Sequence, residues 1–269
     1  MPVERPDPAG GRSFGEEGAR LSYGSYLRLP ALLAQQVTES EPAAHDELLF
    51  ITIHQVYELW FKLLLHELGD ARDAMLAGEA YRPRLRLARA RVIERLLVDQ
   101  IDIVETMTPQ DFLAFRALLA PASGFQSVQF REVEFVSGAK DEAFVARLHD
   151  ATDDERARLV ARLAEPTLWD GYLALLQAAG FAVDTGAARR AALASVSRDR
   201  DRYGALWDLA EALVDHDEQW ALWRSRHVLM VERMIGRKSG TGGSTGAPYL
   251  ATRLNLRFYP ELWELRSHL

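Results

Sequence analysis

Apolar residues recur along most of this chain at intervals of three and four positions, which is the spacing of one face of an α-helix. Runs that alternate apolar and polar residues are missing, and so are the dipeptides that close β-hairpins. The pattern therefore predicts an all-α fold. Its core is expected to come from long helices, the longest at about residues 46–77 and 205–235.

Capping residues place several helix ends. Gly78 can end the first long helix, because glycine accepts the backbone conformation that closes many helices. A further helix is expected over about residues 83–107. Thr108 followed by Pro109 has the form of an N-cap with proline at the first helical position. Residues 152–155, Thr-Asp-Asp-Glu, have the form of a capping box, which predicts another helix start.

The chain is expected to hold one helical domain preceded by an arm. Residues 1–22 are polar and rich in glycine and proline without the apolar stretch of a signal peptide, so they predict a flexible N-terminal arm before a domain at 23–269. A glycine- and serine-rich loop at 236–246 interrupts the helical pattern. The most apolar segment, 48–65, carries His, Gln, Glu and Lys side chains that are costly in lipid. No membrane contact and a cytoplasmic location are predicted.

Composition narrows the classes of partner and cofactor. The formal net charge of −7 over 269 residues leaves no dense basic face for nucleic acid. The arginine-rich stretch at 81–95 alternates with apolar residues and is interpreted as a solvated helix face. The chain has no cysteine, which excludes disulfides, thiolate metal sites and cysteine nucleophiles. Any metal must therefore be held by histidine or carboxylate.

Two of the seven histidines lie on apolar helix faces. His227 shares its face with Trp220, Trp223 and Met234. His54 has apolar neighbours one turn before and one turn after it. Each is either a packed core histidine or a ligand, and the pattern alone does not choose. A lone histidine on a face rich in tryptophan and methionine suits an axial ligand to a planar apolar macrocycle, so haem is the leading cofactor, with His54 as a distal group.

The other histidines and loops offer no competing motif. No histidine has glutamate three residues before it, as a carboxylate di-iron bundle requires, and His-Glu-x-x-His is missing. The glycine-rich loop lacks the Gly-Lys-Ser/Thr ending of a phosphate-binding loop. His216 stands among acidic residues and is expected to be solvated, as are His45, His66, His149 and His268.

Arg116 is surrounded by apolar residues along the chain, in the sequence FLAFRALL. A fixed guanidinium suits the carboxylate of a ligand, because its planar fork matches two oxygens. A salt bridge to an internal Asp or Glu is an equally open interpretation.

Four segments together carry a resemblance: YGSYLRL at 23–29, HDELLFITIHQVYELWFKLLLHEL at 45–68, TMTPQDFLAFRALLAPASGFQSVQFR at 106–131 and WRSRHVLMVERMIGRKSGTGGSTG at 223–246. They resemble the tryptophan 2,3-dioxygenase family, haem enzymes that open the indole ring to give N-formylkynurenine. The resemblance covers most of the chain in the same order. It implies an all-helical cytoplasmic homotetramer, with one haem b per subunit that is ferrous when active and an N-terminal arm exchanged between subunits.

The resemblance also implies roles for single residues. His227 matches the proximal ligand of the haem iron, and His54 matches the distal histidine that hydrogen-bonds the indole N–H. Phe50 matches a phenylalanine packed on the indole. Arg116 matches the arginine that pairs with the substrate carboxylate, and Thr241 the loop threonine that closes over the ammonium and carboxylate.

Four further residues match the surroundings of the site. Ser123 matches a serine near the haem propionates and the distal pocket. Tyr23, Tyr26 and Leu27 match an N-terminal segment that completes the substrate site of a neighbouring subunit. These assignments place both the cofactor and the substrate among residues from every part of the chain.

Three departures from the family pattern bear on substrate detail. Phe112 stands where some members look to carry tyrosine, Ile101 where an aromatic residue is usual, and HQVYEL at 54–59 replaces HQTSEL. The expected reaction adds both atoms of O2 across the indole C2–C3 bond of L-tryptophan, the first step of tryptophan degradation by the kynurenine pathway. Two alternatives stay open: a haem oxygenase of the same fold that puts one oxygen into a substituted tryptophan, and a non-catalytic haem sensor.

Overall fold

The computed structural model describes residues 21–148, 151–243 and 245–269. Across these residues the regular structure is helical throughout, with no β-strand, so the predicted all-α class is confirmed. Internal contacts divide the chain into two units, Met1–Thr38 and Glu39–Leu269, which are described separately. The arm boundary expected at residue 22 stays a prediction.

The first unit contains two single-turn helices, α1 (Tyr23–Tyr26) and α2 (Leu29–Leu32). Ser22 begins α1 with a reciprocal capping box, which satisfies backbone N–H groups that a helix start leaves without partners. The side chains of Tyr23, Tyr26 and Leu27 are exposed. Their exchange between subunits stays a prediction.

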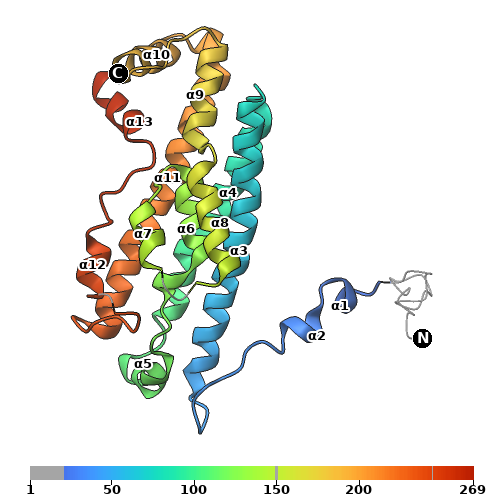
Figure 1. Cartoon of the computed structure of the whole chain (residues 1–269), viewed down its shortest axis with the longest axis vertical. Coiled ribbons are helices and arrows are strands. Elements are labelled where there is room, and N and C mark those ends of the chain that lie inside the picture. The colour runs from blue at the N-terminus through green and yellow to red at the C-terminus, as the bar shows by residue number, and fades with distance from the viewer. Residues whose placement is uncertain (1–20, 149–150, 244) are drawn as a thin grey trace, which may run out of the picture. The chain divides into compact units, whose positions relative to one another are not determined.

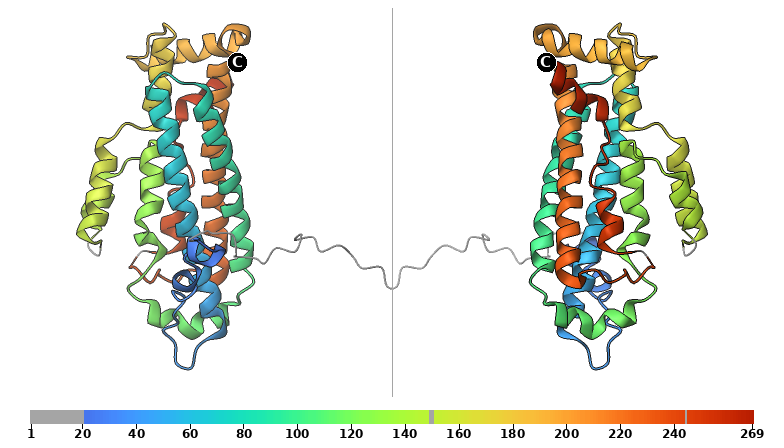
Figure 2. Two further views of the ribbon diagram at one scale, coloured as in Figure 1. Left: turned by 90° about the vertical axis from the view of Figure 1, so that its right-hand side faces the viewer. Right: turned by 90° about the vertical axis from the view of Figure 1, so that its left-hand side faces the viewer.

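Three long helices form the centre of the second unit: α3 (His45–Leu76), α4 (Tyr81–Val104) and α11 (Arg200–Ile235). Figures 1 and 2 show them side by side, with α4 packed along both of the others. Helices α6 (Val128–Ser137) and α9 (Leu168–Ala178) cover α3. The core is therefore built on the two long helices that the sequence pattern predicts, with α4 between them.

Shorter helices complete the second unit. Figures 1 and 2 show α5 crossing one end of the bundle and α10 lying across the other. Their bounds are α5 Pro109–Arg116, α7 Glu142–Arg147, α8 Asp153–Ala164, α10 Gly186–Arg198, α12 Ala247–Ala251 and α13 Pro260–Leu265, with 3-10 turns at Ala117–Leu119, Gly124–Gln126 and Arg266–His268.

The predicted helix ends are confirmed where local chemistry sets them. Thr108 caps α5 and accepts a hydrogen bond from the backbone N–H of Asp111 at 3.2 Å. Thr152 caps α8 in the same way. Gly78, with φ of +85°, follows the end of α3. Helix α11 starts at residue 200, earlier than expected, and Tyr203 marks a kink in its first turns.

The arginine-rich face of α4 forms ion pairs with its neighbours on both sides. Arg89 pairs with Glu67 of α3 at 2.7 Å, and Arg91 pairs with Asp215 of α11 at 3.0 Å. Such half-exposed pairs contribute little stability each, but they disfavour other registers of the three helices. The predicted solvated face is therefore also a charged seam, in which carboxylates neutralise the arginines.

By length and composition alone, α3 could cross a membrane. Its charged side chains show a different use. Buried Glu67 pairs with Arg89, and buried Arg72 donates to Glu165 at 2.7 Å. These neutralised charges place the C-terminal part of α3 in the protein core, because lipid would leave them unpaired.

The expectation that His216 is solvated is wrong. Its side chain is fully buried, with Nδ1 2.6 Å from Glu94 Oε1 and Nε2 2.8 Å from Ser137 Oγ. This network joins α4, α6 and α11. Its acidic neighbour Asp217 is equally buried, so the local run of charges gave the wrong indication.

Asp217 anchors the C-terminal segment, and its replacement tests that role. Oδ2 accepts hydrogen bonds from the backbone N–H groups of Phe258 and Tyr259 at 2.9 and 3.2 Å, and from Trp263 Nε1 at 2.9 Å. We expect Asp217→Ala to lower the free energy of unfolding by about 3–5 kcal/mol, because two buried donors and one partly buried donor lose their shared carboxylate acceptor. Urea unfolding followed by circular dichroism measures the change.

Asp215→Ala is the matched control, because Asp215 pairs with Arg91 at the half-exposed seam. Its cost should stay below about 1 kcal/mol. Equal losses in the two variants would contradict the anchoring role of Asp217.

Candidate active site

A deep cleft in the second unit opens between α3, α5, α6 and α11. Its empty volume is about 1670 Å3, the open mouth included. Most of its wall is apolar or aromatic, and part is formed by residues of the predicted loop at 236–246. An apolar cleft with a few polar groups is the usual form of a cofactor or small-molecule site.

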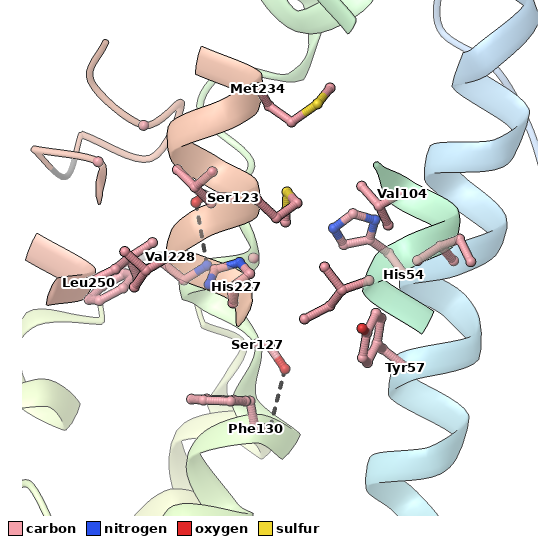
Figure 3. Close-up of a pocket in the computed structure, with 18 of the residues that line it drawn as sticks. His54, Tyr57, Val104, Ser123, Ser127, Phe130, His227, Val228, Met234 and Leu250 are labelled. Carbon is pink, nitrogen blue, oxygen red and sulfur yellow. Dashed lines mark hydrogen bonds between the residues drawn. The ribbon is translucent and has the colours of Figure 1, made fainter. Parts of the chain in front are cut away.

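The two histidines singled out in the sequence both point into this cleft. His54 comes from α3 and His227 from α11, on opposite walls (Figure 3). The helical spacing that predicted their apolar faces thus brings them together. His45, His66 and His268 are exposed as expected, and His149 lies outside the described residues.

His54 presents one nitrogen to the cleft as a hydrogen-bond acceptor. Its Nδ1 lies 2.7 Å from the backbone oxygen of Phe50, and a carbonyl only accepts, so Nδ1 carries the hydrogen. Nε2 then keeps its lone pair. Burial lowers the pKa of His54, while the Phe50 hydrogen bond and the charge of Glu58 oppose that shift. The imidazole is therefore neutral near pH 7.

His227 is a neutral imidazole on the opposite wall. Burial, with a smaller contribution from His54, lowers the pKa of His227 to about 4. Its ring stacks on Trp223 with centroids 4.8 Å apart and planes 8° apart. Within the described residues neither ring nitrogen has a hydrogen-bond partner. A packed core histidine would normally be satisfied, so the geometry favours the ligand interpretation.

Arg116 and Thr241 hold the loop against the rim of the cleft. The Arg116 guanidinium donates to the backbone oxygen of Ser239. Thr241 Oγ1 donates to the backbone oxygen of Ala122 at 2.6 Å. In the described parts of the chain Arg116 has no carboxylate partner. The internal salt bridge that the sequence left open is therefore not found among these residues.

Two of the remaining predicted residues, Phe50 and Ser123, line the cleft. Phe50 contacts His54, with ring centroids 4.1 Å apart, and stacks on Phe112 at 5.6 Å. Ser123 lines the cleft and caps the 3-10 turn at Gly124–Gln126. Tyr23, Tyr26 and Leu27 belong to the first unit, so their part in the site stays a prediction.

Sequence reasoning missed a cluster of three arginines in the cleft wall. Arg131 and Arg224 pair with buried Glu134 at 2.7 and 2.9 Å, and Arg253 lies 3.9 Å from the same carboxylate. The Nε atom of each arginine is buried without a hydrogen-bond partner. Arg253 is equally far from Asp141, so its pairing is loose, and arginine side chains that line a cleft suit an anionic ligand. The spacing of Arg131 and Glu134, three apart on α6, was the only local signal.

The structure adds two methionines to the one that the sequence pattern placed on the His227 face. Met107 and Met230 line the cleft together with Met234. Thioethers are apolar and adaptable, which suits contact with a flat macrocycle. Met230 lies one turn after His227, so a sulfur atom is present beside the candidate iron ligand.

These groups fit an iron porphyrin. In the described segments no three His, Asp or Glu side chains gather at one point, so a cofactor that brings its own equatorial ligands suits the single neutral imidazole of His227. The apolar wall suits a macrocycle, and the arginine side chains that line the cleft, Arg131, Arg224 and Arg253, suit its carboxylates.

Fold and cleft together define a class: an all-helical protein that can hold a planar apolar cofactor beside a small carboxylate ligand. The family model for tryptophan 2,3-dioxygenase matches residues 9–180 and 174–269. Three relatives carry the name tryptophan 2,3-dioxygenase. They come from a Nocardioides species (64% identical; 96% of this chain and 98% of the relative covered), Herpetosiphon aurantiacus (45%; 93% and 98%) and Caulobacter vibrioides (42%; 93% and 98%). This chain belongs to the tryptophan 2,3-dioxygenase family.

Docking of the loop depends on a missing side chain at Gly242. A Cβ atom there would lie 2.6 Å from the Cβ of Ser123, closer than real Cβ atoms approach. We expect Gly242→Ala to lift the loop and to speed tryptic cleavage after Arg237 and Lys238 several-fold. Limited proteolysis with mass spectrometry measures the rate.

Adding Ser123→Gly to Gly242→Ala removes the opposing Cβ and should restore slow cleavage. Gly204→Ala is the matched control, because a Cβ at that helical glycine meets nothing within 4 Å. An unchanged cleavage rate in Gly242→Ala would show that the contact does not hold the loop.

Proposed function

We propose that this chain is a haem-dependent dioxygenase that adds both atoms of O2 across the indole C2–C3 bond of L-tryptophan, giving N-formylkynurenine. The observation that carries the proposal is the pair of opposed neutral histidines, His54 and His227, in one apolar cleft. Membership of the family supports the same reaction. The enzyme would act as a cytoplasmic homotetramer in the first step of the kynurenine pathway, with Tyr23, Tyr26 and Leu27 completing a neighbour's site.

His227 would hold the iron of haem b, and the arginine cluster of Arg131, Arg224 and Arg253 would hold the haem carboxylates, with Ser123 nearby. The lone pair of a neutral imidazole is available to iron without loss of a proton, and burial keeps His227 neutral well below pH 7. Ferrous haem supplies the binding and activation of O2.

The chain's own residues would position the substrate. Arg116 exchanges the carbonyl of Ser239 for the substrate carboxylate, a stronger and bidentate partner. Thr241 lies on the same loop and would close on the ammonium and carboxylate. Phe50 packs on the indole, and His54 Nε2 accepts a hydrogen bond from the indole N–H while its own Nδ1–H stays on the Phe50 carbonyl. Fixing both ends of the amino acid aims the C2–C3 bond.

The substitution Arg116→Ala tests the amino-acid end of the site. Removing one partner of a desolvated guanidinium–carboxylate pair should lower kcat/KM on the order of 100-fold. Steady-state assays with L-tryptophan and tryptamine measure it, because tryptamine has no carboxylate. The variant should discriminate far less between the two than the native enzyme does.

Arg116→Lys is the control that keeps the charge but not the fork. Its kcat/KM for L-tryptophan should lie between those of the native enzyme and Arg116→Ala. Native enzyme that used tryptamine as efficiently as tryptophan would remove Arg116 from recognition.

The two histidines should respond differently to replacement. His227→Ala should lose tight haem binding, whereas His54→Ala should keep the haem and lose roughly 10 to 100-fold in turnover. Absorption spectra and haem titration separate the two effects. Met230→Leu added to His227→Ala excludes a replacement sulfur ligand. Retained haem in that double variant would contradict the axial assignment.

The decisive experiment is aerobic incubation of the reduced holoprotein with L-tryptophan and 18O2. Two labelled atoms in N-formylkynurenine are expected. One labelled atom in the product, or turnover only of a substituted tryptophan, would favour the alternative oxygenase. Full haem occupancy without turnover would favour the sensor. Arg116 argues against a sensor, because a protein that binds only a gas does not need an arginine placed to bind a carboxylate.

A further inference from the structure

The orientation of the His227 ring depends on stacking and not on a hydrogen bond. Histidines that bind metals normally donate their second N–H to a carboxylate or carbonyl, which fixes the ring plane. Within the described residues His227 has no such partner. Its plane is matched instead to Trp223, 8° from parallel and 4.8 Å between centroids.

Trp223 is in turn held mainly by rings. Its Nε1–H is buried without a hydrogen bond of normal geometry, but it approaches the Tyr57 hydroxyl closely enough to oppose the rise in the pKa of that residue. Phe130 and Trp220 contact it, with centroids 5.1 and 6.0 Å away. The edge contact comes from Tyr57, 6.2 Å away with planes 76° apart. Edge-to-face contacts are directional, so the Tyr57 ring helps to set the indole plane.

Tyr57 has the polar anchor that Trp223 lacks. Its hydroxyl donates to the backbone oxygen of Leu97 on α4 at 2.7 Å. Burial raises the pKa of Tyr57 to about 12 against the opposing effect of the Trp223 N–H, so the phenol remains a donor throughout the neutral range. Tyr57 lies one turn after His54 on α3 and borders the same cleft (Figure 3).

We propose that Tyr57 is a positioning residue for the axial histidine. Its hydroxyl, tied to Leu97 of α4, fixes its own ring; that ring fixes the Trp223 indole, and the indole fixes the plane of the His227 imidazole. These contacts fix the plane of the imidazole, as a hydrogen bond to a carboxylate does for other metal-bound histidines. The inference rests on the proposed function only in taking His227 as the iron ligand.

Tyr57→Phe is the test, because it removes one hydroxyl and keeps the ring. The readout is the iron–histidine stretching band in the resonance Raman spectrum of the ferrous holoprotein, which reports the geometry of the axial bond. We expect the band to shift or broaden, and kcat to fall a few-fold with little change in KM.

Tyr172→Phe is the matched control. Tyr172 is also buried, and its hydroxyl also donates to a backbone carbonyl, that of Leu206 at 3.3 Å, but it does not border the cleft. Urea unfolding compares the stabilities of the two variants. The iron–histidine band of Tyr172→Phe should match the native band whatever its stability.

The path through Trp223 gives a second test. Trp223→Leu should change the band more than Tyr57→Phe, and the double variant should match Trp223→Leu alone. An unchanged band in Tyr57→Phe, an equal change in Tyr172→Phe, or a larger change in the double variant would overturn the proposal. A native band that survives His227→Ala would instead show that His227 is not the iron ligand, which is a failure of the proposed function itself.

Discussion

The structure depends on holding two neutral imidazoles at opposite walls of one apolar cleft. Burial lowers the pKa of both His54 and His227 and so favours the neutral imidazoles, but the two residues belong to helices far apart in the chain. Helix α4 keeps α3 and α11 in register through its ion-pair seam and through the buried network of Glu94 with His216. Interactions remote from the cleft thus fix the spacing on which the site depends.

The arginines of α4 and those of the cleft differ in how closely carboxylates pair with them. On α4, side chains such as Arg89 and Arg91 each meet a carboxylate, so the seam is neutral. At the cleft the pairing is looser: Arg131 and Arg224 share Glu134, Arg253 lies 3.9 Å from both Glu134 and Asp141, and Arg116 has a neutral carbonyl as its partner. Loosely paired arginines gathered at one cleft favour an anionic ligand there.

Most of the fold could be predicted from the sequence because local chemistry decides it. The cap at Thr108 and the glycine at Gly78 act within one helical turn, and the apolar face of His227 is visible at helical spacing. The buried state of His216 could not be predicted, because its partners come from other helices and its neighbours along the chain are acidic. The arginine cluster escaped for the same reason, since its members are distant in sequence.

The docked loop also explains how recognition of the amino acid can be selective. Arg116 already donates a hydrogen bond to the carbonyl of Ser239. The free energy that a ligand gains at Arg116 is therefore only the difference between its own interaction with the guanidinium and that of the carbonyl. The guanidinium is charged with either partner, but a carboxylate adds an opposite charge and can accept two parallel N–H bonds, which favours exchange for a carboxylate and not for a neutral group. Thr241 is held on Ala122 in the docked loop and would leave that carbonyl to close on the ligand. In the proposed function the loop would thus make discrimination depend on the charge of the ligand, while the apolar wall would recognise its ring.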